Sequence, residues 1–147
     1  MILPVTLTSA GAAALINAWL AARCGRTRMS EKVLMGDDGN PRMVARMRAH
    51  ANFAEYTPIV LILIGLIELA MGTSTWLWAV AALYLVARIL HPLGMDGTLA
   101  KGRMIGIVVT MLVTIGLGLY AAALPFLMTG KISAISPGAE IETVPLG

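Results

Sequence analysis

Residues 104–130 read MIGIVVTMLVTIGLGLYAAALPFLMTG and contain no charged side chain. A helix needs about 20 mostly apolar residues to cross the roughly 30 Å hydrocarbon core of a bilayer. Residues 1–22 and 69–87 are also free of charge, and so is the stretch 56–67 at the end of a further long block. The pattern predicts an all-α membrane protein with four transmembrane helices. We expect these helices at about residues 5–28, 43–71, 75–92 and 103–128.

The chain as a whole is too apolar for an ordinary soluble domain. Of its 147 residues, 58% are hydrophobic and 13% are charged, and the mean hydropathy is +0.81. Soluble domains are about 45–50% apolar and about 25% charged. This composition excludes a disordered chain, a collagen-like repeat and a nucleic-acid-binding domain. The single cysteine, Cys24, excludes an internal disulfide framework and a multi-cysteine zinc site, and we predict no metal.

The positive charges lie almost entirely on one side of the predicted bundle. Ten of the 11 basic residues fall around the first–second or the third–fourth connection, and Lys131 alone falls on the opposite side. The positive-inside rule places the basic side in the cytoplasm, so both termini are expected across the membrane from it. The first apolar block precedes its basic residues, which is the reverse of a signal peptide, and we expect it to remain as a helix.

Short connections predict an up-down four-helix bundle. Residues 36–41, GDDGNP, are typical of a turn between the first two helices, and residues 72–75, GTST, of a tight outer turn. Residues 91–97, HPLGMDG, are expected to end the third helix. We expect a single domain over residues 1–147, in which residues 129–147 form a loosely ordered C-terminal tail.

The second helix carries a polar stripe near its basic end. Arg48, Asn52 and Glu55 are spaced i, i+4, i+7 and fall within roughly 60° on one helical face, with Tyr56 on its flank. Ionisable groups inside a membrane normally face a bundle interior, a partner or a water-filled cavity. Arginine can bind a carboxylate, glutamate an ammonium group, and asparagine both donates and accepts. The stripe predicts a site for a zwitterionic ligand; alternatively, Arg48 and Glu55 pair with each other or across helices.

The third and fourth helices add polar groups at the same end. Tyr84, Arg88 and His91 share one face of the third helix, and Arg103 begins the fourth. Taken alone, Arg103 is better explained as an interfacial cation than as a functional residue. Its interpretation as a functional group therefore depends on the stripe across the bundle.

Three other polar residues have structural interpretations. His50 points away from the stripe. We expect both His50 and Asn17 to form interhelical hydrogen bonds. Glu68 lies near the outer end of its helix, where a carboxylate that reaches toward the membrane surface is favoured over a proton-carrying role.

The residues now described resemble those of a known family. Residues 48–58, RAHANFAEYTP, followed by an apolar run, resemble the signature of the MAPEG family, the membrane-associated proteins in eicosanoid and glutathione metabolism. Residues 88–94, RILHPLG, are similar to the second element of that family, and Arg103 follows at about the expected distance. Residues 26–28 and the short loop 36–39, GDDG, are most like the small bacterial members.

The resemblance covers residues 5–128 and implies a homotrimer of four-helix protomers. Glutathione would bind between neighbouring subunits at the cytoplasmic ends of the helices, in a protein of the bacterial inner membrane. In this arrangement Arg48, Asn52 and Glu55 would bind the polar groups of the tripeptide, and Tyr56 would flank them.

The resemblance also implies roles for five further side chains. Arg26 of the neighbouring subunit would add a carboxylate contact, with Arg28 as the alternative. Arg88 and His91 would line the same site. Arg103 would lie beside the thiol as the catalytic residue.

The chemistry of such a site follows from the acidity of a thiol. A free thiol has a pKa near 8.5 and is mostly protonated at neutral pH, whereas the thiolate is the nucleophile. A fixed guanidinium favours the anion, and a shift of two pKa units corresponds to about 2.7 kcal/mol. The implied function is a glutathione-dependent transferase or peroxidase that acts on hydrophobic electrophiles arriving from the bilayer, a detoxification chemistry.

Two positions depart from the family pattern. Met95 stands where several members have a tyrosine, and Met104 stands where the prostaglandin-forming member has a serine. Both departures remove hydroxyl groups, so we do not transfer prostaglandin or leukotriene synthesis to this chain. They also leave open a non-catalytic structural or accessory membrane trimer. A transporter or channel is a third possibility, but the polar residues stop near Pro58 instead of continuing across the membrane.

Overall fold

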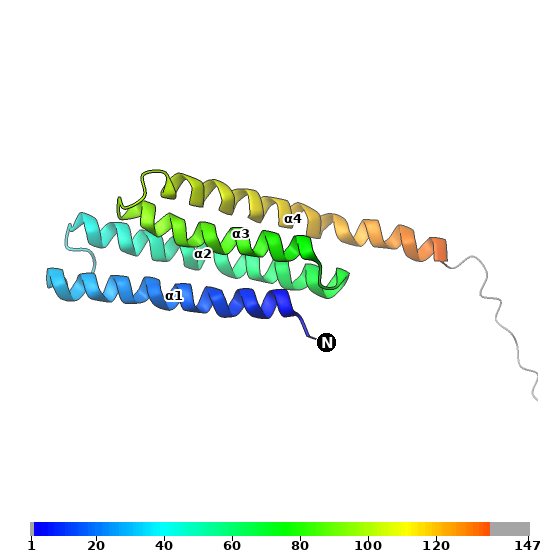
Figure 1. Cartoon of the computed structure of the whole chain (residues 1–147), viewed down its shortest axis with the longest axis horizontal. Coiled ribbons are helices and arrows are strands. Elements are labelled where there is room, and N and C mark those ends of the chain that lie inside the picture. Colours follow the sequence, from blue (N-terminus) through cyan, green and yellow to red (C-terminus); the bar gives the residue numbers. More distant parts are fainter. Residues whose placement is uncertain (1, 136–147) are drawn as a thin grey trace, which may run out of the picture.

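The computed structural model describes residues 2–135, with side chains as far as residue 128, and folds into four α-helices. These are α1 (Pro4–Glu31), α2 (Pro41–Met71), α3 (Thr75–Met95) and α4 (Gly102–Ile135). Each helix runs antiparallel to the one before it (Figure 1). All four are long and apolar enough to cross a membrane, and no strand occurs in the described part of the chain. The prediction of an all-α, up-down bundle of four membrane-spanning helices is confirmed.

The central layer of the bundle is the antiparallel pair α2 and α3. Helix α1 packs against both of them on one side, and α4 packs against both on the other, so that α1 and α4 do not touch within the described residues (Figure 1). The outer faces of these two helices therefore stay uncovered. Leu15 on α1 and Leu119 on α4, for example, are 75% and 69% exposed. In a membrane protein such faces meet lipid or another protomer.

The helix ends follow local sequence signals. Pro41 occupies the first turn of α2, and the Asn40 side chain accepts hydrogen bonds from the backbone N–H groups of Arg42 and Met43 at 3.0 Å. This is the usual N-cap arrangement. Helix α1 ends where Lys32 adopts a left-handed conformation. The α1–α2 and α3–α4 connections share one end of the molecule, which we call the basic end; the other end is the opposite end.

Helices α3 and α4 approach each other unusually closely at the basic end. A Cβ atom added to Gly94 would lie 2.0 Å from the backbone nitrogen of Arg103, and one added to Gly102 would lie 2.6 Å from the carbonyl oxygen of Leu90. Only glycine leaves room for such contacts between backbones. This close approach places the start of α4, including Arg103, directly beside the end of α3.

Glu68 holds the opposite end of the bundle together. Its carboxylate accepts hydrogen bonds from the backbone N–H groups of Val5 and Thr6 at 3.0 and 2.8 Å and from the Thr6 hydroxyl at 2.7 Å. It also accepts from the hydroxyl of Thr73 in the α2–α3 turn at 2.9 Å. Glu68 is 1% exposed. The interpretation of Glu68 as a carboxylate that reaches toward the membrane surface is therefore wrong, because the free N–H groups at the start of α1 bind it inside the bundle.

Helix α4 extends beyond the other three helices at the opposite end (Figure 1). It continues to Ile135, past residue 129, where the sequence predicted the start of a loosely ordered tail. Residues 126–135 contain no proline, so none of them lacks a backbone N–H for the helix. The rest of the predicted tail, residues 136–147, lies outside the described residues.

Candidate functional site at the basic end

A cleft of about 270 Å³ opens between α2, α3 and α4 at the basic end. Four of the lining residues belong to α2, three of them to its polar stripe, and the other four come from the end of α3 and the start of α4. The lining residues are Arg48, Ala51, Asn52, Glu55, His91, Met95, Arg103 and Ile107. The structure thus brings the predicted stripe together with His91 and Arg103, two of the residues that the resemblance placed beside it.

The two charged members of the stripe do not neutralise each other. Arg48 and Glu55 are both exposed, and neither forms an ion pair or a hydrogen bond with any residue in the described part of the chain. Arg48 and Glu55 therefore do not pair with each other within the protomer. The cleft therefore presents one free cation and one free carboxylate on the same helical face.

Asn52 connects the cleft to a buried cation behind its wall. The Nη2 atom of Arg88 donates to Oδ1 of Asn52 at 2.9 Å, and its Nη1 atom donates to the Thr110 hydroxyl at 2.9 Å. Arg88 is fully buried and is not among the residues that line the cleft. Its guanidinium also lies over the ring of Phe53, with Cζ 5.7 Å from the ring centroid. Arg88 thus reaches the cleft only through Asn52 in this protomer.

His91 and Arg103 form the wall opposite the stripe. His91 is 3% exposed, and its Nδ1 atom has no hydrogen-bond partner within the described residues. A Cβ atom at Gly106 would lie 2.5 Å from the Cβ of His91, so the absence of a side chain on α4 makes room for the imidazole. Arg103 is exposed and forms no ion pair with the described residues.

Besides Arg88, three of the predicted site residues lie outside this cleft. Tyr56 is half-buried but does not line the cleft. Arg28 donates to the carbonyl oxygen of Gly36 at 3.0 Å, so its guanidinium braces the α1–α2 loop. Arg26 is exposed on α1 and has no hydrogen bond or ion pair to the described residues. Of the two alternatives for a contact to a neighbouring subunit, the protomer leaves Arg26 available.

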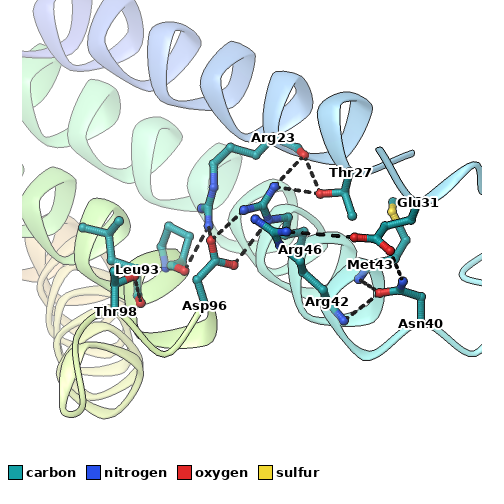
Figure 2. Close-up of polar contacts among 11 residues, drawn as sticks. Arg23, Thr27, Glu31, Asn40, Arg42, Met43, Arg46, Leu93, Asp96 and Thr98 are labelled. Atoms are coloured by element: carbon teal, nitrogen blue, oxygen red, sulfur yellow. Dashed lines mark hydrogen bonds and ion pairs between the residues drawn. The ribbon is translucent and has the colours of Figure 1, made fainter. Parts of the chain in front are cut away.

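Next to the cleft, an ion-pair network ties three elements together (Figure 2). Asp96, just after α3, accepts from Arg23 of α1 and from Nη2 of Arg46 of α2, the latter at 3.1 Å. Arg23 also donates to the carbonyl oxygen of Pro92 at 3.3 Å, and Arg46 donates to the hydroxyl of Thr27 at 2.7 Å. Burial of Asp96 opposes its ionisation, but the hydrogen bonds and charges of the two arginines prevail, so the pKa of Asp96 is lower than usual.

Sequence reasoning missed this network and the glycines that bring α3 and α4 together. Asp96 is an acidic residue between Arg88 on one side and Lys101 and Arg103 on the other. A lone acid among basic residues was the signal in the sequence from which an ion pair could have been predicted. By contrast, the expected interhelical roles of Asn17 and His50 are confirmed, because the two side chains hydrogen-bond to each other at 2.9 Å.

Comparison with known proteins agrees with the predicted family and with the membrane fold. A sequence model of the MAPEG family matches residues 6–123. Two curated relatives, both called inner membrane protein YecN, come from Escherichia coli K12 and from Escherichia coli O6:H1 strain CFT073. Each is 33% identical over 86 residues, which is 58% of this chain and 65% of the relative, so the match spans about two thirds of the relatives' length. The chain is a membrane protein that belongs to the MAPEG family.

Proposed function

We propose that this protein is a membrane-embedded, glutathione-dependent transferase or peroxidase. The observation that supports the proposal is that the polar stripe and Arg103 meet in one cleft. Among the described residues, neither charge of the stripe has an ion-pair partner. Glutathione carries two carboxylates, an ammonium group, two peptide bonds and a thiol. The cleft offers a partner for each kind of group, and it needs no metal to do so.

The proposed roles follow from the chemistry of each side chain. Arg48 binds a carboxylate of the tripeptide, and Glu55 accepts from its ammonium group. Arg103 lies across the cleft from the stripe, where its guanidinium stabilises the thiolate of glutathione. In the transferase reaction the thiolate sulfur then forms a bond to a hydrophobic electrophile that enters from the lipid, and the displaced group leaves with the electron pair of the broken bond. No side chain of the protein has to act as a covalent nucleophile.

The proposal extends to assembly and location. We place the protein in a bacterial inner membrane as a homotrimer, with the basic end and its cleft facing the cytoplasm and both termini on the other side. Arg26 of a neighbouring protomer would then complete the site with a further carboxylate contact. Its free, exposed guanidinium supports that role over the same role for Arg28, which is engaged with Gly36.

A second candidate function is a non-catalytic structural or accessory trimer of the same fold. Met95 favours it, because this thioether lines the cleft at a position where a hydroxyl group would give a ligand a hydrogen bond. This candidate predicts no thiolate and no turnover.

Binding and turnover measured on purified variants separate the two candidates. We expect Arg48→Ala and Glu55→Ala to weaken glutathione binding about tenfold or more, since each removes a charge-assisted contact. We expect Arg103→Ala to lose turnover of a chromogenic electrophile more than binding. Arg42→Ala is the matched control, because Arg42 is an exposed arginine of α2 that does not line the cleft. Equal turnover by Arg103→Ala and wild type would contradict the role of Arg103.

A further inference from the structure

Arg88 is a buried cation, and each of its two terminal nitrogens donates a hydrogen bond to another helix. Nη1 donates to the Thr110 hydroxyl on α4, and Nη2 donates to the side-chain oxygen of Asn52 on α2. Among the described residues no carboxylate forms an ion pair with Arg88, and its Nε atom has no partner. A guanidinium that is 0% exposed and bound to two neutral acceptors is held in place by those acceptors and by the Phe53 ring.

The contact between Arg88 and Asn52 decides which way the asparagine amide points. A guanidinium has donors and no acceptor, so the atom of the amide that faces it must be the oxygen. The amide nitrogen of Asn52 is then left for the cleft, which Asn52 lines. Asparagine at this position therefore turns its N–H donors toward a ligand, whereas the residue type alone would allow either the donors or the oxygen to face it.

We propose that Arg88 is a positioning residue that fixes Asn52 as a hydrogen-bond donor toward the cleft, and thereby selects a carbonyl or carboxylate oxygen of the ligand at that point. The inference rests on the proposed function and deepens it, because it assigns the order of groups along the stripe. Acceptors of the ligand lie against Arg48 and Asn52, and its ammonium group lies against Glu55. A ligand with a donor opposite Asn52 is rejected, since two N–H groups would face each other.

Arginine is suited to this task in a way that lysine is not. Its planar fork makes the bonds to Asn52 and Thr110 at the same time and in fixed directions, whereas a lysine ammonium is a single point with rotating donors. Thr110, on α4, anchors one arm of the fork and so helps to aim the other arm at Asn52. Thr110 is 1% exposed and does not line the cleft, so its effect on a ligand passes through Arg88.

A double-mutant cycle on the dissociation constant of S-methylglutathione tests the proposal. This probe has no free thiol, so it reports recognition of the tripeptide apart from thiolate formation. We expect Asn52→Ala and Arg88→Lys each to weaken binding about tenfold, the loss of one hydrogen bond to a charged or peptide group. If Arg88 acts through Asn52, the double variant binds no more weakly than Asn52→Ala alone. Effects that multiply to about 100-fold would overturn the proposal.

Thr110→Val gives an independent measurement with a milder change. We expect it to raise KM for glutathione severalfold and to leave kcat at saturating glutathione unchanged, because Arg103 is untouched. Thr114→Val is the matched control: Thr114 lies one turn further along α4, and within the described residues its hydroxyl bonds only to the backbone oxygen of Thr110. Equal KM values for Thr110→Val and Thr114→Val, in variants that melt like the wild type, would also overturn the proposal.

The two proposals fail in different ways. Wild-type protein that binds neither glutathione nor its S-methyl derivative would contradict the proposed function, and this inference with it. Wild-type protein that binds the probe but shows independent effects of Asn52 and Arg88 would contradict the inference alone.

Discussion

Gly94 is the position at which the packing of α3 on α4 most directly controls the cleft. In Gly94→Ala the new Cβ atom would lie 2.0 Å from the nitrogen of Arg103, 2.6 Å from the carbonyl carbon of Gly102 and 2.8 Å from the Cα atom of Arg103. All three are backbone atoms, which cannot rotate away, and ordinary contacts of a Cβ atom begin at about 3.4 Å. The start of α4 must therefore move by more than an ångström relative to the end of α3.

This displacement has two measurable consequences. Forcing a methyl group into a closed contact costs about 1–3 kcal/mol of stability, so the melting temperature should fall by several degrees. The same movement shifts Arg103 relative to Asn52 and Glu55, and a misplacement of about 1 Å can lower turnover about 100-fold. Thermal unfolding of the purified protein and its glutathione-dependent turnover measure the two effects separately.

Gly118→Ala is the control for this prediction. A Cβ atom at Gly118, on the same helix, would meet nothing within 4 Å. Alanine there should raise stability by about 0.5–1 kcal/mol through its higher helix propensity, with turnover unchanged. If Gly94→Ala melted and turned over like Gly118→Ala, the close approach of α3 and α4 would not be what positions Arg103.

Two further predictions concern the ionic contacts that hold the helices together. Asp96→Asn removes the ion pairs to Arg23 and Arg46 and should cost about 1–3 kcal/mol at pH 7. The pKa of Asp96 is lower in the folded protein than the unfolded value of about 3.9, so Asp96 stabilises the fold fully above that value and loses this effect as the pH falls through the folded pKa. The difference in melting temperature between Asp96→Asn and wild type should therefore shrink toward pH 3. A difference that stays constant with pH would contradict this assignment. The Glu68 carboxylate accepts four hydrogen bonds, whereas the amide of Glu68→Gln also carries an NH2 group that can only donate. The variant should therefore melt several degrees lower than the wild type and bind glutathione normally. An unchanged melting temperature would show that Glu68 does not anchor α1.

The sequence predicted those features that depend on one helix at a time. Four apolar blocks define four spans, and a period of 3.6 residues puts Arg48, Asn52 and Glu55 on one face, where the cleft indeed has them. The MAPEG resemblance supplied the order of the elements. It also predicted that His91 and Arg103 lie beside the stripe. The periodicity of a single helix cannot predict this, because these residues belong to α3 and α4.

The features that sequence reasoning missed depend on contacts between helices. The position of Glu68 in its helix gives its depth in the membrane, but it does not show that the backbone N–H groups at the start of α1 bind its carboxylate. Periodicity places Arg88 on the right face but does not show that the side chain stops behind Asn52 instead of reaching the cleft. The role of Gly94 requires the distance between two backbones, and no one-dimensional pattern carries that distance.

The ionisation of glutathione on the protein is the most direct test of the account. Mixing purified wild-type protein with saturating glutathione at neutral pH should give a thiolate absorbance in the near ultraviolet, stoichiometric with the sites. The same titration of Arg103→Ala should give bound glutathione with little thiolate. No thiolate signal from wild-type protein at saturation, or an undiminished signal from Arg103→Ala, would contradict the claim that this cleft binds glutathione and uses Arg103 to ionise it.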